Sequence, residues 1–389
     1  MHQKNNVPVI VEKIYALLIS IRRSSSRRVL LIRFVRPRRA HTAPRARRAA
    51  DVRMRAVSFA APALVLALLA RLLRGRRGDA SSRSSKELPQ AVSDSAKSIA
   101  ALRALESERT DPPPLFVDPF AAALAGEETL ARVRARGDGD KGRIAIRTRF
   151  FDDAVLAALA RHRPAQVVLL GAGLDTRAWR LSPPEGKPKA RAVFELDVPE
   201  VLDRKARILA ETATASASAS ASASAAASEP PPLTLAERYV SVHANFARPG
   251  WLRALRDAGH DPSVPTVWIL EGLLYYLSPG VVDRVLRGAA NASAAGSTLV
   301  ASVVNRASWA RATRKGSKGA KATWASWMDD PEASFGAAGW TTTTVAQPGE
   351  SRAAFGRWRG ESPPPRGAER EGEPQTPRTF YVVCRVVEE

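Results

Sequence analysis

A glycine turn between two predicted strands is the pattern in this sequence that most directly suggests chemistry. Gly171 and Gly173 follow the apolar run Val167–Leu170, and Asp197 ends the next apolar run. Glycines allow a sharp turn and let a ligand lie against bare backbone. A carboxylate at the end of the second strand is placed to accept hydrogen bonds from two ribose hydroxyls. This order of elements is typical of α/β proteins that hold a nucleotide-like ligand at the carboxyl ends of parallel strands.

The same turn argues against a dinucleotide cofactor. The GxGxxG fingerprint seats a pyrophosphate on a helix N-terminus and needs a third glycine. Here the turn is GAGLDT, so Thr176 occupies that position. The pattern therefore disfavours a nicotinamide or flavin and favours a cofactor that has a ribose but no pyrophosphate. S-adenosylmethionine fits that description.

Several segments together resemble the leucine carboxyl methyltransferase family, and most closely its broad branch of S-adenosylmethionine-dependent O-methyltransferases. Four of them are RTRFFDD (147–153), LLGAGLDTRAWRL (169–181), VFELDVPEVLDRKARIL (193–209) and WILEGLLYYL (268–277). Two more, residues 101–126 and 238–255, resemble that branch's N-terminal cap and the region of its third strand. The resemblance spans roughly residues 95–305 in the family's order, and it implies a class I methyltransferase with S-adenosylmethionine as cofactor.

The resemblance assigns residues to the methionyl end of the cofactor. Arg147 would pair with the methionyl carboxylate, which suits the fork of a guanidinium, and Arg149 is its competitor. Gly171 would accept a hydrogen bond from the methionyl amino group through its carbonyl, and Gly173 shares the turn. Glu271 follows the run VWIL at a strand end and would help to hold the amino group. A buried carboxylate without a partner is costly, which favours a site role for Glu271 over a helix cap.

The resemblance also assigns the adenosine end. Asp197 would bind the ribose, with Glu195 two residues earlier as the alternative. The segment HANF (243–246) aligns with a region that usually carries an acid for the adenine amino group. Asn245 stands there and its side-chain carbonyl can still accept that hydrogen bond without the charge. Phe246 completes this part of the predicted cofactor site.

The acceptor side of the site is less well defined by the sequence. Tyr275 and Tyr276 could line a substrate pocket, although one of the two is expected to be ordinary core packing. Asp175 and Thr176 are expected to cap the following helix. None of the five histidines lies in a matched catalytic motif. A carboxylate acceptor needs no base because it is already ionised at neutral pH, so the absence mildly favours one.

The presence of a single cysteine excludes two classes of site, disulfides and cysteine zinc sites. Cys384 is the single cysteine, so neither a disulfide framework nor a cysteine zinc site is possible. It lies in an apolar run, where buried packing is the expected role. We expect no metal in the site.

The strongly basic charge belongs to the beginning of the chain. Residues 1–86 contain 21 of the 60 lysines and arginines but three of the 38 acids, so they carry +18 of the net +22. This leader suits a transit peptide for a chloroplast or mitochondrion. Its apolar run 57–70 is short for a membrane span and suits a signal-peptide core or an interfacial anchor. A mispredicted upstream extension is the third interpretation. Arginines without interleaved aromatic residues are weak evidence for nucleic-acid binding.

Residues 87–389 are predicted to form an α/β methyltransferase domain with a helical cap at 95–145. Alternating strands and helices indicate a Rossmann-like, seven-stranded, mostly parallel sheet with helices on both faces. The final strands lack a clear connecting helix, which indicates one antiparallel strand. The Ala/Ser-rich stretch 212–232 cannot bury a core and is predicted to be a disordered insertion. The expected strands are one beginning at Gln166, then Ala192–Leu196, Tyr239–Val242, Val267–Leu270, Thr298–Val304, Thr341–Val345 and Thr379–Val387.

These observations support three hypotheses for function. The first is a methyltransferase that transfers a methyl group in line from S-adenosylmethionine to an oxygen of a small molecule or carboxylate. The second is a methyltransferase-like binding module with weak or no activity, which rests on the change to Asn245. The third, a nucleic-acid-binding protein, rests only on the basic leader. Contact with a membrane through 57–70 is possible if the leader is retained.

Overall fold

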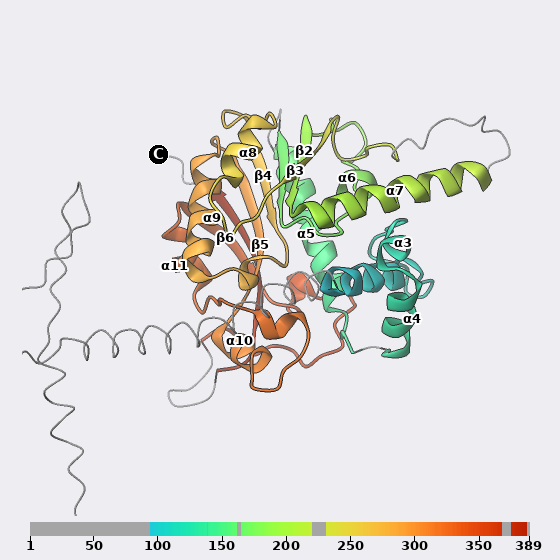
Figure 1. Cartoon of the computed structure of the whole chain (residues 1–389). Coiled ribbons are helices and arrows are strands. Elements are labelled where there is room, and N and C mark those ends of the chain that lie inside the picture. The colour runs from blue at the N-terminus through green and yellow to red at the C-terminus, as the bar shows by residue number, and fades with distance from the viewer. Residues whose placement is uncertain (1–93, 138, 162–164, 220–230, 368–374, 387–389) are drawn as a thin grey trace, which may run out of the picture. The chain divides into compact units, whose positions relative to one another are not determined.

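The computed structural model describes residues 94–137, 139–161, 165–219, 231–367 and 375–386 (Figure 1). These described residues all belong to one compact unit. The predicted leader 1–86 and its apolar run 57–70 lie outside the described residues. Among the helices that are described, none is both long and apolar enough to cross a membrane.

A seven-stranded sheet forms the centre of this unit and confirms the predicted fold class. Its strand order is β3-β2-β1-β4-β5-β7-β6. The first five strands are mutually parallel, whereas β7 runs antiparallel to both β5 and β6. The strands are β1 (Gln166–Leu170), β2 (Ala192–Asp197), β3 (Tyr239–His243), β4 (Thr266–Leu270), β5 (Thr298–Val304), β6 (Trp340–Ala346) and β7 (Thr379–Val386).

The central strands are apolar along their whole length because helices cover both sides of the sheet. Every residue of β1, β4 and β5 is buried. Val168 of β1 is in register with Phe194 of β2 and Trp268 of β4, so these three side chains share one face. The continuous apolar runs in the sequence are thus explained by burial on two sides.

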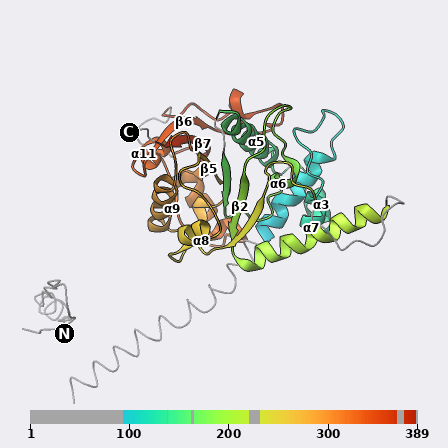
Figure 2. The ribbon, with the colours of Figure 1, turned by 90° about the horizontal axis from the view of Figure 1, so that it is seen from above.

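Helices cover the two faces of the sheet in separate groups (Figures 1 and 2). One group contains α5, α6 and α7 together with the N-terminal cap, and we call its side the cap face. The other contains α8, α9 and α11, and we call its side the α9 face. The helices are residues 94–107, α3 (Ala121–Ala125), α4 (Glu127–Ala135), α5 (Arg143–Arg161), α6 (Arg177–Arg180), α7 (Pro199–Ala219), α8 (Trp251–Asp257), α9 (Pro279–Asn291), α10 (Arg306–Ala312) and α11 (Pro331–Gly336). Short 3-10 turns are η1 (Leu274–Tyr276), η2 (Ala320–Thr323) and η3 (Ser351–Ala353).

Helix α7 extends into the insertion 212–232, whose residues 220–230 lie outside the described residues, so its disorder stays a prediction. Helix α7 continues to Ala219 instead of ending at Glu211. Alanine has the highest helix propensity, and residues 212–219 contain no glycine or proline that would end a helix. The hydroxyls of Thr212 and Thr214 also donate to backbone carbonyls one turn earlier. Figure 2 shows the outer end of α7 extending past α3.

Candidate functional site

The sequence-predicted residues converge where the carboxyl ends of β1, β2 and β4 meet. Strand β1 lies between β2 and β4, so the chain turns toward β2 on leaving β1 and toward β5, in the opposite direction along the sheet, on leaving β4. Ligands of open α/β sheets bind at such a switch point, outside the carboxyl ends of the strands. Gly171 follows β1, Asp197 ends β2, and Glu271 follows β4. The fold therefore places these three residues at one edge of the sheet.

The turn after β1 requires its glycines. Gly171 and Gly173 have φ values of +69° and +53°, a region that side chains with a Cβ rarely adopt. A Cβ on Gly171 would lie 2.8 Å from Cδ1 of Leu273, which follows β4. The backbone N–H of Gly171 donates to the carbonyl of Leu196 in β2. The turn is thus packed tightly against the segment after β4 and hydrogen-bonded to β2.

Asp197 holds this turn and keeps part of its carboxylate available. Its Oδ2 accepts from the Gly173 N–H at 2.8 Å, and its Oδ1 accepts from the Val198 N–H at 2.7 Å. Each carboxylate oxygen can accept a second hydrogen bond, which leaves room for a ligand hydroxyl. Burial raises the pKa of Asp197, and the two backbone hydrogen bonds only partly offset that increase.

Glu195, the alternative ribose ligand, is excluded by its surroundings. It is fully buried, forms an ion pair with Lys205 and accepts a hydrogen bond from the Tyr239 hydroxyl at 2.7 Å. Alternate residues of a strand share a face, but Glu195 lies inside the sheet rather than at its end. It therefore joins β2 to β3 and α7 and does not face a ligand.

Arg147 and Glu271 form an ion pair at this edge. Arg147 Nε lies 2.7 Å from Glu271 Oε1, and each side chain is 13% exposed. Burial raises the pKa of Glu271, but Arg177 and Arg147 lower it by more, so it stays below the usual value. Among the described residues Glu271 is the one hydrogen-bond partner of the Arg147 side chain, which leaves the terminal nitrogens able to bind an anion. Arg149, the competitor, pairs with Asp153 on the surface.

Tyr275 lies next to this ion pair. A Cβ on Gly272 would lie 3.4 Å from the Tyr275 hydroxyl and 3.8 Å from Nη1 of Arg147, so both groups approach the backbone after β4. The Tyr275 ring packs against Tyr276 and Trp324, with ring centroids 5.0 and 4.7 Å apart. Tyr275 is buried and Tyr276 is partly exposed. Of the two predicted pocket residues, Tyr276 is thus the more accessible.

The predicted adenine segment follows β3 as expected, and its side chains have local partners. Asn245 is exposed, and its Oδ1 accepts from the Ala247 N–H at 3.0 Å. Phe246 is buried and packs edge-on against Trp251 with ring centroids 6.0 Å apart. A cofactor role for these two residues stays a prediction, and the second lone pair of Asn245 Oδ1 is the group that could take part.

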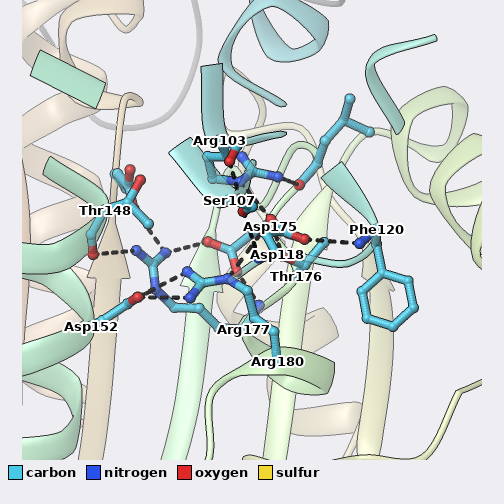
Figure 3. Close-up of polar contacts among 12 residues, drawn as sticks. Arg103, Ser107, Asp118, Phe120, Thr148, Asp152, Asp175, Thr176, Arg177 and Arg180 are labelled. Carbon is cyan, nitrogen blue, oxygen red and sulfur yellow. Dashed lines mark hydrogen bonds and ion pairs between the residues drawn. The ribbon is translucent and has the colours of Figure 1, made fainter. Parts of the chain in front are cut away.

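A cluster of buried charges behind the site was missed by the sequence analysis (Figure 3). It consists of arginines and carboxylates that link the cap helix, α5 and α6, and we call it the buried cluster: Arg103, Asp118, Asp152, Asp175, Arg177 and Arg180. Arg177 Nε lies 2.7 Å from Asp152 Oδ1, and Arg180 contacts both oxygens of Asp152. Burying charges this deeply is costly unless they are paired, and here each one is.

The cluster corrects one predicted role and explains another. Asp175 caps α6 as predicted, because its Oδ1 accepts from the Arg177 N–H at 2.7 Å. Thr176 does not cap with its side chain, since its hydroxyl donates to Asp118 at 2.7 Å. The sequence shows two arginines three residues apart in the segment DTRAWRL, but it does not show their partners.

The residues at the edge fit S-adenosylmethionine. Its methionyl part is a zwitterion, and Arg147 and Glu271 offer one group of each charge. Its ribose carries two hydroxyls, and Asp197 offers a carboxylate. Within the described residues no group of histidines, cysteines and acids could hold a metal ion.

The chain is similar to a known protein family and to several known proteins. The family model for leucine carboxyl methyltransferase matches residues 96–290. A protein of Streptomyces avermitilis, named as a proposed S-adenosyl-L-methionine-dependent methyltransferase, is 36% identical over 296 residues, which cover 73% of this chain and 94% of the relative. A similarly named protein of Mycolicibacterium smegmatis is 37% identical over 227 residues, covering 55% and 67%. A solved methyltransferase-like structure from Thermobifida fusca is 22% identical, covers 69% of this chain and 92% of its own, and gives a TM-score of 0.41.

Proposed function

Because this chain belongs to the leucine carboxyl methyltransferase family and is an S-adenosylmethionine-dependent methyltransferase, we propose that it methylates an oxygen of a small carboxylate. The Arg147–Glu271 ion pair, which keeps a small part of each side chain exposed, is the observation that places the cofactor in this proposal. The cofactor's carboxylate and ammonium groups would each find an opposite charge there. Binding therefore exchanges one charge pairing for two, without leaving a buried charge alone.

Asp197 and the glycine turn would bind the adenosine end. The ribose hydroxyls donate to the free lone pairs of Asp197, whose geometry is already fixed by the Gly173 N–H. A carboxylate held in advance loses little freedom on binding, which favours affinity. Asn245 and Phe246 would lie on the adenine side, at the end of β3.

A carboxylate acceptor is favoured by the groups around Tyr275. Burial raises the pKa of Tyr275 to about 12, so its phenol stays protonated at neutral pH and does not act as a base. An ionised carboxylate needs no base.

Catalysis would then consist of alignment. The bound cofactor supplies an electrophilic methyl group on a positively charged sulfur. Arg147, Glu271 and Asp197 hold its two ends, while the aromatic rings near Tyr275 orient the acceptor and exclude water. A lone pair of the acceptor oxygen forms the new bond to carbon, and the electrons of the broken C–S bond remain on sulfur. Holding the two partners in line can account for a large share of the rate.

Calorimetry of S-adenosylmethionine binding to the full-length protein tests the site. We expect Asp197→Ala to weaken binding by roughly a hundredfold, because it removes a charged acceptor of two hydrogen bonds. Asp203→Ala is the matched control, since that aspartate lies on α7 with its side chain 69% exposed. A wild-type protein that is folded but does not bind would instead support the inactive-module alternative.

The acceptor is tested by incubating the protein with methyl-labelled cofactor and a panel of small carboxylates, phenols and alcohols. Formation of methyl esters that release methanol on alkaline hydrolysis is the expected result. Transfer to phenols alone would contradict the carboxylate assignment and leave the cofactor site intact.

A further inference from the structure

Glu271 is held from two opposite sides, and only one of its partners was expected. Arg147 contacts Oε1 at 2.7 Å, and Arg177 Nη1 lies 2.8 Å from Oε2. With both oxygens held, the carboxylate cannot rotate freely about its last side-chain bonds. Arg147 thus holds the carboxylate by a hydrogen bond and an ion pair, and Arg177 holds it by an ion pair on the other oxygen.

Arg177 is not placed to touch a ligand itself. Its side chain is 1% exposed, whereas those of Arg147 and Glu271 are 13% exposed. It also contacts the carboxylates of Asp152 and Asp175, and its Nη2 donates to the Thr148 carbonyl of α5. Arg177 is thus fixed from behind and can act on a ligand only through Glu271.

The N-terminal cap holds the loop that leads from β1 to Arg177 (Figure 3). Arg103 of the cap helix donates to the Leu174 carbonyl at 2.6 Å and pairs with Asp118 at 2.8 Å. Asp118 in turn accepts from the Thr176 hydroxyl. The residues on both sides of Asp175 are therefore hydrogen-bonded to the cap. These bonds fix the start of α6, where Arg177 is the first residue.

We propose that Arg177 is a positioning residue for the methionyl end of the cofactor, which fixes the Glu271 carboxylate opposite Arg147 and is itself held by the cap through Arg103 and Asp118. The inference rests on the proposed function, because it takes Glu271 as the ligand of the cofactor's amino group. It goes further in assigning a site function to a residue that the ligand never reaches.

A pair of ligands separates this role from a general structural one. S-adenosylmethionine has the methionyl group, whereas 5′-methylthioadenosine shares its adenosine but has neither the amino group nor the carboxylate. Both are titrated by calorimetry into the full-length wild type, Arg177→Met, Arg177→Lys and Leu286→Ala. Leu286 is buried on the α9 face, so its variant is a control for loss of stability alone.

The expected result is a loss of affinity for S-adenosylmethionine but not for 5′-methylthioadenosine. Arg177→Met should weaken S-adenosylmethionine binding at least tenfold and change 5′-methylthioadenosine binding by less than twofold. Arg177→Lys keeps the charge without the fork and should lie between Arg177→Met and wild type. Leu286→Ala should leave both affinities unchanged.

Several outcomes would overturn the inference. Equal losses for both ligands would mean that Arg177 only supports the fold, and unchanged binding of S-adenosylmethionine would mean that Glu271 is positioned without it. If Arg177→Met does not fold, the comparison of Arg177→Lys with wild type decides by the same criteria. Failure of the wild type to bind S-adenosylmethionine would instead overturn the proposed function.

Discussion

The two faces of the sheet are built from different chemistry. On the α9 face, large apolar side chains such as Trp268, Trp340, Phe335 and Leu286 pack as a continuous core. On the cap face, an apolar core is interrupted by the buried cluster, in which Asp118, Asp152 and Arg177 have almost no exposure to water. Among the described residues the buried ion pairs lie on the cap face, whereas the pairs on α8 and α9 are exposed at the surface.

This difference suggests that apolar packing stabilises the fold, whereas the buried ion pairs fix the positions of the site residues. Apolar packing contributes about 25 cal/mol for each Å² removed from water and tolerates small rearrangements. Buried ion pairs add little net stability, but breaking one leaves a charge alone and is strongly unfavourable. The cap face therefore fixes the geometry of Glu271 and the glycine turn, while the α9 face mainly supplies stability and reaches the predicted site at Phe246.

The largest expected effect comes from breaking the buried cluster at its centre. Asp152→Asn keeps the shape of a side chain that Arg177 and Arg180 share, but removes its charge. We expect the free energy of unfolding to fall by about 3–5 kcal/mol, because two buried guanidinium groups lose a partner. Urea denaturation measures this, and a loss below 1 kcal/mol would show that water reaches the cluster.

A somewhat smaller loss is expected from the opposite face. Leu286→Ala should lower the free energy of unfolding by about 2–5 kcal/mol through the cavity it leaves. Its cofactor affinity should match wild type, unlike that of Asp152→Asn. If Leu286→Ala weakened cofactor binding as strongly as Asp152→Asn does, the proposed difference in role between the two faces would be refuted.

The faces should also differ in their response to acid. Burial lowers the pKa of His260 from 6.5 to about 4 on the α9 face, where its ring packs against Phe194 and Trp268. The folded protein thus favours the neutral histidine, so stability is fully present above pH 6.5 and decreases as the pH falls toward 4.

The buried cluster should respond in a lower pH range. Burial raises the pKa of Asp118 and of Asp175, but neighbouring arginines lower both by more, so their contribution is lost only below about pH 4. Urea denaturation at several pH values measures both ranges. His260→Gln should flatten the upper range and leave the lower one, and an unchanged upper range would contradict the assignment.

The smallest effect is expected at the surface of the cap. Glu108 pairs with Arg134 at 2.7 Å, but the two side chains are 49% and 56% exposed. Glu108→Ala should therefore cost less than about 1 kcal/mol and leave cofactor affinity unchanged. Thermal denaturation and calorimetry check this, and a large effect would mean that surface charges of the cap also reach the site.

The sequence was sufficient for the strands and for the residues at their ends. Apolar runs bounded by turns predicted β1 to β5 within about two residues, and short-range motifs placed Gly171, Asp197 and Glu271 on one edge. Composition did not predict that α7 continues to Ala219, because a polar, low-complexity sequence can still extend a helix that is already formed.

The buried cluster could not be predicted from the sequence in the same way. Arg177 contacts Asp152, 25 residues earlier, and Glu271, 94 residues later. No local pattern reports such pairs, because they exist only after α5, α6 and β4 are packed together. Glu195 illustrates the converse, since its place beside Asp197 suggested a ligand and only the fold revealed its ion pair with Lys205.

The position of β7 bears on how the protein is made. Strand β6 precedes β7 in the chain and is therefore synthesised first. In the sheet, however, β7 lies between β5 and β6 and pairs with both. A nascent chain on the ribosome therefore presents an open edge at β5, which invites pairing with other chains. Tyr381 of β7 also packs against Phe150 and Phe151 of α5, the helix that carries Arg147. We expect the cofactor site to mature last, which leaves a period in which chaperones would protect that edge.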